Sequence, residues 1–381
     1  MKPTLLIMTD WFLPGYKAGG PIRSIANLCR ELAGDYELLI LTGDRDYGDE
    51  EPYAEISPNT WIAWEGGAKV WYASPGWLTL SSLERLIKEV NPVYVYLNSM
   101  FSVKFAVWPV YLLAMKRMSA QLVWAPRGML HKGAIQYKKG RKLLFLAWVR
   151  LMGLPAHMIF HATDEQEAED ITQYMGAKAS PSVIANLTHL PSLPPTRKLK
   201  VAGQLVMGFI SRIHPKKNLA FLLAVLQKVS AQVTLLIWGP VEDEAYWENC
   251  QALIENLPGN IQVLYGGVLT HKGVEEKLSV VDVFALPTHG ENFGHAIFEA
   301  FAKGAPVIIS QKTPWRALEK ENAGWDLPLE EELWTQQLEE IAKLDQKEFQ
   351  FWQKGARAYA EKKSQNAALV TSYKSLFLSD V

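Results

Sequence analysis

The segment Val283–Ile309 reads VFALPTHGENFGHAIFEAFAKGAPVII and contains a strand, a loop, a helix and a second strand. The apolar runs Val283–Leu286 and Val307–Ile309 are short and do not alternate with polar residues, which is typical of buried parallel strands. Between them, apolar residues recur at helical spacing over residues 294–303. A strand, a helix and a second strand in this order form the unit from which α/β sheets are built, so we predict an α/β protein.

The same alternation of short apolar runs and longer helical runs extends from this segment toward both ends of the chain. Further buried strands are predicted at Leu5–Met8, Leu38–Leu41, Val93–Leu97, Leu122–Trp124, Met158–Phe160, Leu205–Ile210, Val233–Trp238 and Ile261–Leu264. The tail, residues 330–381, is predicted to be wholly helical, with breaks near Asp345 and Lys363. Apolar strands that alternate with helices predict parallel sheets that are covered on both faces.

A proline-rich stretch, Leu190–Lys200, interrupts this alternation with the sequence LPSLPPTRKLK, which is typical of a linker. The length of 381 residues suits two domains, at roughly 150 residues per domain. We therefore predict an N-terminal domain over residues 1–192, a C-terminal domain over residues 193–362 and a final helix over residues 363–381. Two such domains are expected to face each other across a cleft and to bind ligands beyond the carboxyl ends of their strands.

The composition excludes several classes of protein. The 39 basic and 40 acidic residues leave a net charge of −1, which provides no overall positive field for a nucleic acid. The two cysteines, Cys29 and Cys250, are too few for a disulfide framework or a cysteine-rich metal site, and they favour the reducing cytoplasm. No apolar stretch without charge reaches the length of about 18 residues that a membrane-spanning helix needs, so no spanning helix is expected.

Two glutamates belong to the predicted loop and helix that follow Leu286. Glu291 lies in the loop, and Glu299 lies in the helix eight positions later. The backbone N–H groups of residues 293–295 are expected at the helix N-terminus, where such groups bind phosphate or sugar oxygens. A carboxylate accepts hydrogen bonds from two hydroxyls, so each glutamate is a candidate for binding a sugar or a ribose. The alternative is a pair of solvated surface glutamates.

A second polar stretch, Gly208–Leu219, reads GFISRIHPKKNL and begins in the predicted strand that ends at Ile210. Arg212 and Lys217 lie five positions apart in the loop that follows this strand. The guanidinium supplies a fork of donors and the ammonium supplies a point charge, a combination that suits a diphosphate. The alternative is an ordinary basic surface loop.

Together, the two stretches resemble the signature motifs of the family-4 retaining glycosyltransferases, which have the GT-B fold of two Rossmann-like domains. That family carries a phosphate clamp of an arginine and a lysine, and Arg212 and Lys217 match it in order and spacing. It also carries a Glu-x7-Glu motif, which Glu291 and Glu299 match.

Further segments extend the resemblance over nearly the whole chain. Gly19-Gly20-Pro21 resembles the glycine-rich loop that follows the first strand in the family. The segments Ala125–Leu130, APRGML, and His161–Thr163 resemble a branch of the family that acts in bacterial polysaccharide assembly. The resemblance also implies that the last helix crosses back to the N-terminal domain.

The resemblance implies a role for each matched residue. Arg212 and Lys217 would neutralise the donor diphosphate, Glu299 would bind the ribose hydroxyls, and Glu291 would bind a hydroxyl of the donor sugar. Glycines in the N-terminal domain would let the backbone approach the phosphates closely. The remaining donor-binding residues implied in this way are Gly19, Gly20, Gly267, Val268, Asn292, Phe293, Gly294 and His295.

One position departs from the family pattern. Many members have a histidine after a central strand of the first domain, whereas here the strand Leu122–Ala125 leads into Arg127. Arg127 is therefore expected either to stabilise charge during the reaction or to bind the acceptor, and a structural ion pair is the alternative. With Arg212, Lys217 and Glu291, it completes the set of predicted catalytic residues.

No metal site is predicted. Asp44 and Asp46 spell the Asp-x-Asp motif of metal-dependent glycosyltransferases that have another fold, but a lone pair of loop carboxylates supplies too few ligands for a divalent cation. The segment Tyr137–Leu154, YKKGRKLLFLAWVRLMGL, is basic and then apolar, which suits contact with an anionic membrane surface. Its apolar residues, however, surround the helix on nearly all sides, which is typical of a buried helix.

The sequence therefore predicts a retaining, metal-independent hexosyltransferase that uses no cofactor, with UDP-glucose as the donor. The expected acceptor is a glycan or lipid-linked glycan of a surface or extracellular polysaccharide. The enzyme is expected in the cytoplasm, with peripheral contact to the membrane as an additional expectation. Three alternatives remain open: a GDP-mannose-dependent mannosyltransferase, a GT-B sugar-nucleotide epimerase and a non-catalytic nucleotide-sugar binder.

Overall fold

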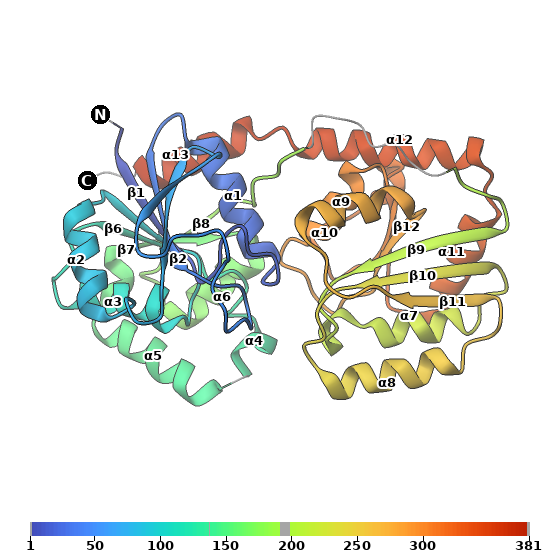
Figure 1. The fold of residues 1–381 in the computed structure, drawn as a ribbon, viewed down its shortest axis with the longest axis horizontal. Helices are drawn as coiled ribbons and strands as arrows, with labels where there is room; N and C mark the ends of the chain where they lie inside the picture. Colours follow the sequence, from blue (N-terminus) through green and yellow to red (C-terminus); the bar gives the residue numbers. More distant parts are fainter. Residues whose placement is uncertain (1, 137, 191–198, 379–381) are drawn as a thin grey trace. The chain divides into compact units, whose positions relative to one another are not determined.

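The computed structural model describes residues 2–136, 138–190 and 199–378. The chain divides into two compact units, shown as ribbons in Figure 1. The first unit comprises residues 1–187 and 366–381, and the second comprises residues 188–365. The predicted boundary at residue 362 is three residues from the limit at residue 365, and the predicted boundary at residue 192 lies outside the described residues. The predicted linker centre near residue 195 lies outside the described residues.

The sheet of the first unit has the strand order β3-β4-β2-β1-β5-β6-β7-β8. All neighbouring strands pair in parallel except β3 and β4, which pair antiparallel. The strands are β1 (Thr4–Met8), β2 (Glu37–Gly43), β3 (Trp61–Trp64), β4 (Ala68–Ala73), β5 (Tyr94–Leu97), β6 (Gln121–Trp124), β7 (Met158–Ala162) and β8 (Pro181–Val183).

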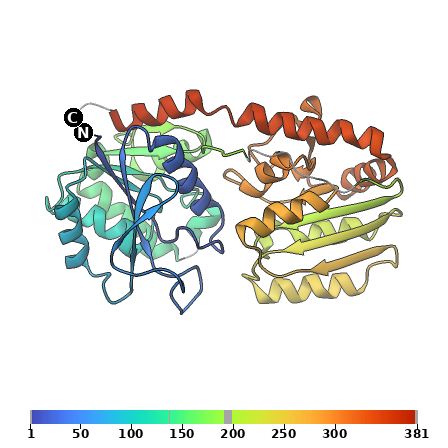
Figure 2. The same cartoon turned by 45° about the horizontal axis from the view of Figure 1, so that its top comes forward.

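Helices cover both faces of this sheet, because successive residues of a strand point to opposite sides. Leu5 and Ile7 of β1 pack in one apolar cluster with α1 and α13, whereas Leu6 and Met8 pack in another with α2, α3, α5 and α6. Figure 2 shows α13, which is distant in sequence, beside α1. The helices of the first unit are α1 (Gly20–Leu32), α2 (Leu80–Val90), α3 (Trp108–Ala114), α4 (Lys132–Gln136), α5 (Lys139–Leu151), α6 (Glu165–Met175) and α13 (Ala367–Leu378).

The sheet of the second unit is parallel throughout and has the strand order β11-β10-β9-β12-β13-β14. Its strands are β9 (Gln204–Ile210), β10 (Gln232–Trp238), β11 (Ile261–Tyr265), β12 (Val283–Leu286), β13 (Val307–Ser310) and β14 (Gly324–Leu327). Its helices are α7 (Leu219–Leu226), α8 (Glu244–Glu255), α9 (His271–Val280), α10 (His295–Ala302), α11 (Glu331–Lys343) and α12 (Gln346–Lys363).

Each strand predicted from the sequence is present, and the helical tail breaks at the two predicted positions. The sequence pattern does not predict β3, β4, β8 or β14, which lie at the ends of the two sheets. Cys29 and Cys250 are buried and form no disulfide. Within residues 2–136, 138–190 and 199–378, no helix is both long and apolar enough to span a membrane.

Candidate functional site

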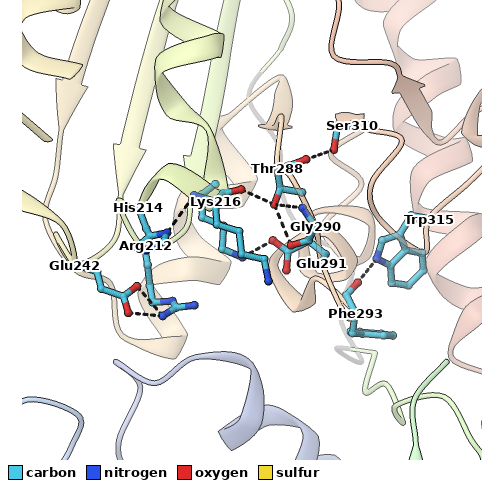
Figure 3. Close-up of polar contacts among 11 residues, drawn as sticks. Arg212, His214, Lys216, Glu242, Thr288, Gly290, Glu291, Phe293, Ser310 and Trp315 are labelled. Atoms are coloured by element: carbon cyan, nitrogen blue, oxygen red, sulfur yellow. Dashed lines mark hydrogen bonds and ion pairs between the residues drawn. The ribbon is translucent and has the colours of Figure 1, made fainter. Parts of the chain in front are cut away.

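The two polar loops predicted from the sequence follow neighbouring strands of the second unit. β9 ends at Ile210 and β12 ends at Leu286, and these strands pair with each other in parallel. The carboxyl ends of neighbouring parallel strands lie at one edge of the sheet, where α/β proteins bind ligands. Figure 3 shows that the side chains of both loops meet at this edge.

Both predicted cations of this edge are paired with carboxylates. The Nη1 atom of Arg212 donates to the two carboxylate oxygens of Glu242, at 2.7 and 2.6 Å. The Nζ atom of Lys217 contacts the Oε1 atom of Glu291. The Arg212 side chain is 44% exposed, whereas the Lys217 and Glu291 side chains are 12% and 11% exposed. A ligand can therefore reach one cation from solvent, and the other is held in a largely buried pair.

A buried threonine connects the two loops. The Oγ1 atom of Thr288 lies 3.1 Å from the backbone oxygen of Lys216 and accepts a hydrogen bond from the N–H of Gly290, also at 3.1 Å. The N–H of His289 donates to the same Lys216 oxygen at 2.8 Å. The hydroxyl of Ser310 in turn donates to the backbone oxygen of Thr288 at 2.5 Å. These contacts fix the position of the loop after β9, residues 211–218, relative to the loop after β12, residues 287–294. We call the first the clamp loop and the second the glutamate loop.

The clamp loop concentrates positive charge. Burial lowers the pKa of Lys216, and the neighbouring cations Lys217 and Arg212 also lower it, whereas Glu291 raises it. The carboxylates of the site therefore do not fully offset the repulsion between these cations. A bound anion would relieve this repulsion, which is what a diphosphate site requires.

The helix after the glutamate loop starts in a conformation that favours glycine. Gly294 precedes α10 with a φ angle of 78°, in the left-handed region. A Cβ atom at this position would also lie 2.8 Å from the Cδ1 atom of Ile297. The first N–H groups of a helix lack partners within the helix and attract oxygen ligands. Glu291 lies just before this helix start and Glu299 lies within α10, as the sequence predicts.

Aromatic side chains support the same loop. The indole Nε1 atom of Trp315 donates to the backbone oxygen of Phe293 at 2.5 Å, as Figure 3 shows. The ring of Phe293 lies 5.1 Å from the ring of Trp315 and 4.7 Å from the ring of His295, measured between centroids. Packing and hydrogen bonding therefore hold the segment that contains Asn292 and Phe293.

The predicted base-binding segment joins the same edge of the sheet. The carbonyl of Gly267, beyond the end of β11, accepts a hydrogen bond from Gly239, which follows β10, at 2.9 Å. Gly239 also lies against Ser211, because a Cβ atom there would approach the Ser211 oxygen to 1.9 Å. The side chain of Val268 is 39% exposed. The loops after β9, β10 and β11 therefore form one continuous edge.

The remaining predicted residues lie in the first unit. Gly19 has a φ angle of 69° and precedes α1, and Gly20 is the first residue of that helix. The carboxylate of Asp46 accepts hydrogen bonds from the N–H groups of Tyr16 and Lys17, at 2.7 and 3.0 Å, and so holds the loop that leads to these glycines.

The two aspartates of the Asp-x-Asp sequence therefore make contacts within the protein. Asp46 is 4% exposed and binds the backbone of the glycine loop, and Asp44 is 4% exposed and pairs with Arg45 at 2.9 Å. In the part of the chain that the structure describes, no group of three or more His, Cys, Asp or Glu side chains is arranged to hold a metal ion.

Arg127 follows β6 and is held by three polar side chains, two from β5 and the residue after it and one from the segment that follows β8. Its Nε, Nη1 and Nη2 atoms donate to Asn98 at 2.6 Å, Asn186 at 2.6 Å and the hydroxyl of Tyr96 at 2.7 Å. Its φ angle of 56° is rare for a residue with a side chain, so these contacts stabilise a strained backbone. Burial lowers the pKa of Arg127, but Tyr96 and the carboxylate of Glu167 are among the groups that raise it, and the net direction is upward.

A buried histidine extends this arginine network. The Nε2 atom of His161 lies 2.8 Å from the carbonyl of Ile184, which can only accept, so this nitrogen carries the hydrogen. The Nδ1 atom then accepts from the Tyr96 hydroxyl at 2.7 Å. Burial lowers the pKa of His161 to about 3, and the positive charge of Arg127 contributes to this shift. His161 is therefore neutral at physiological pH and orients Tyr96 beneath Arg127.

The sequence pattern does not point to Glu242, Thr288 or Tyr96 as parts of these sites. Glu242 pairs with a residue 30 positions earlier, and Thr288 bonds to a backbone oxygen 72 positions earlier. Only the folded chain brings such partners together. The one signal in the sequence is position, since each of the three residues lies at or near the carboxyl end of a predicted strand.

Two sequence comparisons match part of the chain. Residues 204–362 match the family model described as Glycosyl transferases group 1. The putative glycosyltransferase EpsF of Bacillus subtilis (strain 168) is 31% identical over 135 residues. This alignment spans 33% of the present chain and only 31% of the length of EpsF.

Several solved structures resemble the whole chain. HepE of Anabaena, in complex with UDP and glucose, has a TM-score of 0.68 and 16% identity, and the match covers 99% of this chain and 100% of HepE. Sucrose-phosphate synthase of Thermosynechococcus elongatus has a TM-score of 0.73 and 16% identity, with complete coverage of both chains. WaaG, a glycosyltransferase involved in lipopolysaccharide biosynthesis, has a TM-score of 0.62 and 13% identity, with coverage of 98% and 99%.

At this low identity, the structural matches establish the fold, and the family model describes the segment that contains the clamp and the glutamate loops. The chain thus has the GT-B fold of two Rossmann-like domains, and its residues 204–362 match the model of the group 1 glycosyl transferases.

Proposed function

We propose that this protein is a retaining, metal-independent glycosyltransferase that moves glucose from UDP-glucose onto a glycan or lipid-linked glycan. The observation that carries the proposal is the arrangement of Arg212, Lys217 and Glu291 at one sheet edge of a group 1 domain. The preference for UDP and glucose draws support from HepE, whose solved complexes contain UDP, glucose and UDP-glucose.

Donor binding is expected to exchange ion pairs at this edge. The diphosphate would take Arg212 from Glu242 and Lys217 from Glu291, since both cations are already directed to oxygen ligands. Glu291, released from Lys217, would then accept hydrogen bonds from hydroxyls of the donor sugar. Glu299 would bind the ribose, and the segment of Gly267 would contact the base.

The proposed reaction takes place on one face of the sugar. The bond between the anomeric carbon and the diphosphate oxygen breaks, and the acceptor oxygen forms its bond to the same carbon. The acceptor proton passes to the released diphosphate. Arg212 and Lys217 would stabilise the negative charge that develops on the leaving group, which is the electrostatic catalysis that such preorganised cations provide.

The acceptor is expected at the first unit, where Arg127 would bind it or stabilise charge. Asn98, which holds Arg127, has a buried Nδ2 atom without a hydrogen-bond partner in the described structure. That donor is a candidate for a hydroxyl of the acceptor. We further propose that the enzyme acts in the cytoplasm on a surface or extracellular polysaccharide and makes peripheral contact with the membrane.

The proposal is tested by calorimetric titration with UDP, GDP, ADP and their glucose and mannose conjugates, with a chelator present. Tight binding of UDP and UDP-glucose, followed by transfer with retained anomeric configuration, is the expected result. Conversion of UDP-glucose to another nucleotide sugar without an acceptor would instead indicate an epimerase. Preferred binding of GDP-mannose would replace the donor. Binding without hydrolysis or transfer in an acceptor screen would indicate a non-catalytic binder.

A further inference from the structure

The first unit contains an apolar cavity that none of the proposed steps uses. It has a volume of about 410 Å³ and is lined by Leu80, Val107, Trp108, Tyr111, Phe145 and Trp148. These residues come from the start of α2, from α3 and the residue before it, and from α5. The volume lies within the range of roughly 300–1,000 Å³ that is usual for small-ligand sites. The lining is almost entirely apolar, so the cavity suits a hydrocarbon group.

Exposed apolar side chains surround this cavity on the same helices. On α5, Leu144 is 73% exposed and Leu151 is 87% exposed, and with the cavity residue Trp148 they follow the spacing of one helix face. On α3, Tyr111 is also exposed, and Met115 follows directly after the helix. The all-round apolar pattern of α5 thus does not bury the helix completely. One apolar face packs on the core through Leu146 and Val149, and another is presented outward.

Positive charge outweighs negative charge beside this apolar face. Between Glu89 and Asp164 the sequence contains no acidic residue and ten basic ones. Several of them lie at the ends of α3 and along α5. Of those that are exposed, Arg117 pairs with Glu84 of α2, and the others are Lys116, Lys138, Lys139, Arg141 and Arg150. The whole chain is nearly neutral, so this segment concentrates cations on the elements that carry the cavity.

We propose that α3 and α5 form a docking face for an anionic phospholipid bilayer, and that an acyl chain enters the cavity between them. Apolar side chains that insert at the interface and cations that attract anionic headgroups are the two requirements of such a face. A second copy of this chain would bring like charges together, which disfavours self-association through the same face. The inference rests on the peripheral membrane contact of the proposed function and assigns that contact to one surface.

The test measures binding of the full chain to vesicles by flotation. One set of vesicles is pure phosphatidylcholine, and the other contains phosphatidylcholine and phosphatidylglycerol in equal parts. We expect binding to the second set only, and weaker binding at high salt because salt screens the attraction. Leu144→Glu with Leu151→Glu should reduce the affinity by about tenfold or more, since both side chains would lose their apolar contact. Lys139→Glu with Arg141→Glu should reduce it by about fivefold or more for each cation.

Matched controls separate this face from general effects of charge. Phe351→Glu changes an exposed apolar residue of α12, and Lys347→Glu with Lys354→Glu reverses two exposed cations of the same helix. These controls should leave vesicle binding unchanged. Equal loss in the controls, or binding that the α5 variants do not alter, would overturn the proposal. Self-association through this face, observed by sedimentation without lipid and abolished by the Leu144 and Leu151 changes, would also overturn it.

Acyl chains brominated along their length test the cavity itself, because bromine quenches indole fluorescence on contact. Replacement of Trp108 and Trp148 by Phe should remove most of the quenching and leave flotation intact. Quenching that persists in this variant would show that the cavity stays empty. UDP titration of every variant keeps the two questions apart, because failure of the donor site changes UDP binding and failure of the docking face changes only vesicle binding.

Discussion

Each unit has an arginine near the carboxyl ends of its strands, Arg212 in the second unit and Arg127 in the first, and the two differ in exposure and in the number of their partners. Arg212 of the second unit is 44% exposed and pairs with a single carboxylate. Arg127 of the first unit donates to three different side chains, and buried Tyr96, His161 and Glu167 surround it. The second edge can exchange its ion pair for a ligand, whereas the first uses most of its hydrogen-bonding capacity to hold its own shape.

This difference separates two ways of using a cation. A partly exposed ion pair costs little to break, so Arg212 can turn to a diphosphate. A guanidinium with several fixed partners cannot move without leaving buried polar groups unsatisfied. Arg127 therefore suits a fixed positive charge beside a reaction centre, and its substitution should affect folding before it affects chemistry.

The largest expected effect is on stability and contrasts the two arginines directly. Arg127→Met should lower the free energy of unfolding by about 3–5 kcal/mol, because the groups that accept hydrogen bonds from the guanidinium would lose their charged donor in a buried environment. Arg212→Met is the matched control and should cost no more than about 1 kcal/mol. Urea unfolding followed by tryptophan fluorescence measures both. Equal losses in the two variants would remove the distinction between a fixed and an exchangeable cation.

The next effect concerns turnover. Lys217→Ala should reduce the transfer rate by about 10²–10³-fold, as expected when a preorganised charge at a leaving group is removed. Lys216→Ala, a change in the adjacent lysine, is the control and should cause a much smaller loss. Both rates are measured with saturating donor and acceptor. A larger effect at Lys216 than at Lys217 would reassign the clamp.

The two glutamates should separate binding from turnover. Glu299→Gln should weaken UDP binding by about tenfold to a hundredfold, the usual cost of a hydrogen bond to a charged group. Glu291→Gln should leave UDP affinity nearly unchanged and lower the transfer rate, because its proposed partner is the sugar. Calorimetry with UDP and a transfer assay on the same preparations give both values. The reverse pattern would exchange the two roles.

A smaller effect appears in the pH dependence of stability. The pKa of His161 is about 3 in the folded protein and near its ordinary value of 6.5 in the unfolded chain. Below pH 6.5 the unfolded state takes up a proton that the folded state does not, so this residue lowers stability as the pH falls toward 3. The slope should be about 1.4 kcal/mol per pH unit in that window and vanish above it.

The measurement is urea unfolding of the wild type and of His161→Gln between pH 4 and pH 7. The difference between their free energies of unfolding should show the predicted slope. A difference that is independent of pH would mean that His161 titrates alike in both states.

The sequence predicts the strands of the sheet centres because continuous apolar runs mark strands that are buried on both faces. It does not predict the end strands, because β3 and β4 carry exposed and polar positions and because β8 (PSV) and β14 (GWDL) contain no continuous apolar run. The apolar pattern of the sequence also fails to predict how far α5 is buried. An all-round apolar helix is normally buried, yet Leu144 and Leu151 face outward, because α5 packs on the core along one face.

The site was predictable to the extent that local sequence carries it. Arg212, Lys217 and Glu291 follow strands that pair in space, and the order of elements along the chain implies that juxtaposition. The partners Glu242 and Thr288 depend on contacts across loops, which no local pattern encodes. The same holds for Tyr96 and His161, whose roles follow from their positions on neighbouring buried strands.

The smallest expected effect tests whether the Arg212 pair is exchangeable. Glu242→Gln removes the charge that competes with a diphosphate, so UDP affinity should rise, by no more than about fivefold, because partly exposed ion pairs contribute at most about 1 kcal/mol. Glu248→Gln, an acidic change at an exposed position of α8, is the matched control for overall charge and should leave UDP affinity unchanged. A fall in UDP affinity in Glu242→Gln would mean that this carboxylate orients Arg212 for the donor. The second unit would then rely on a fixed cation, as the first unit does.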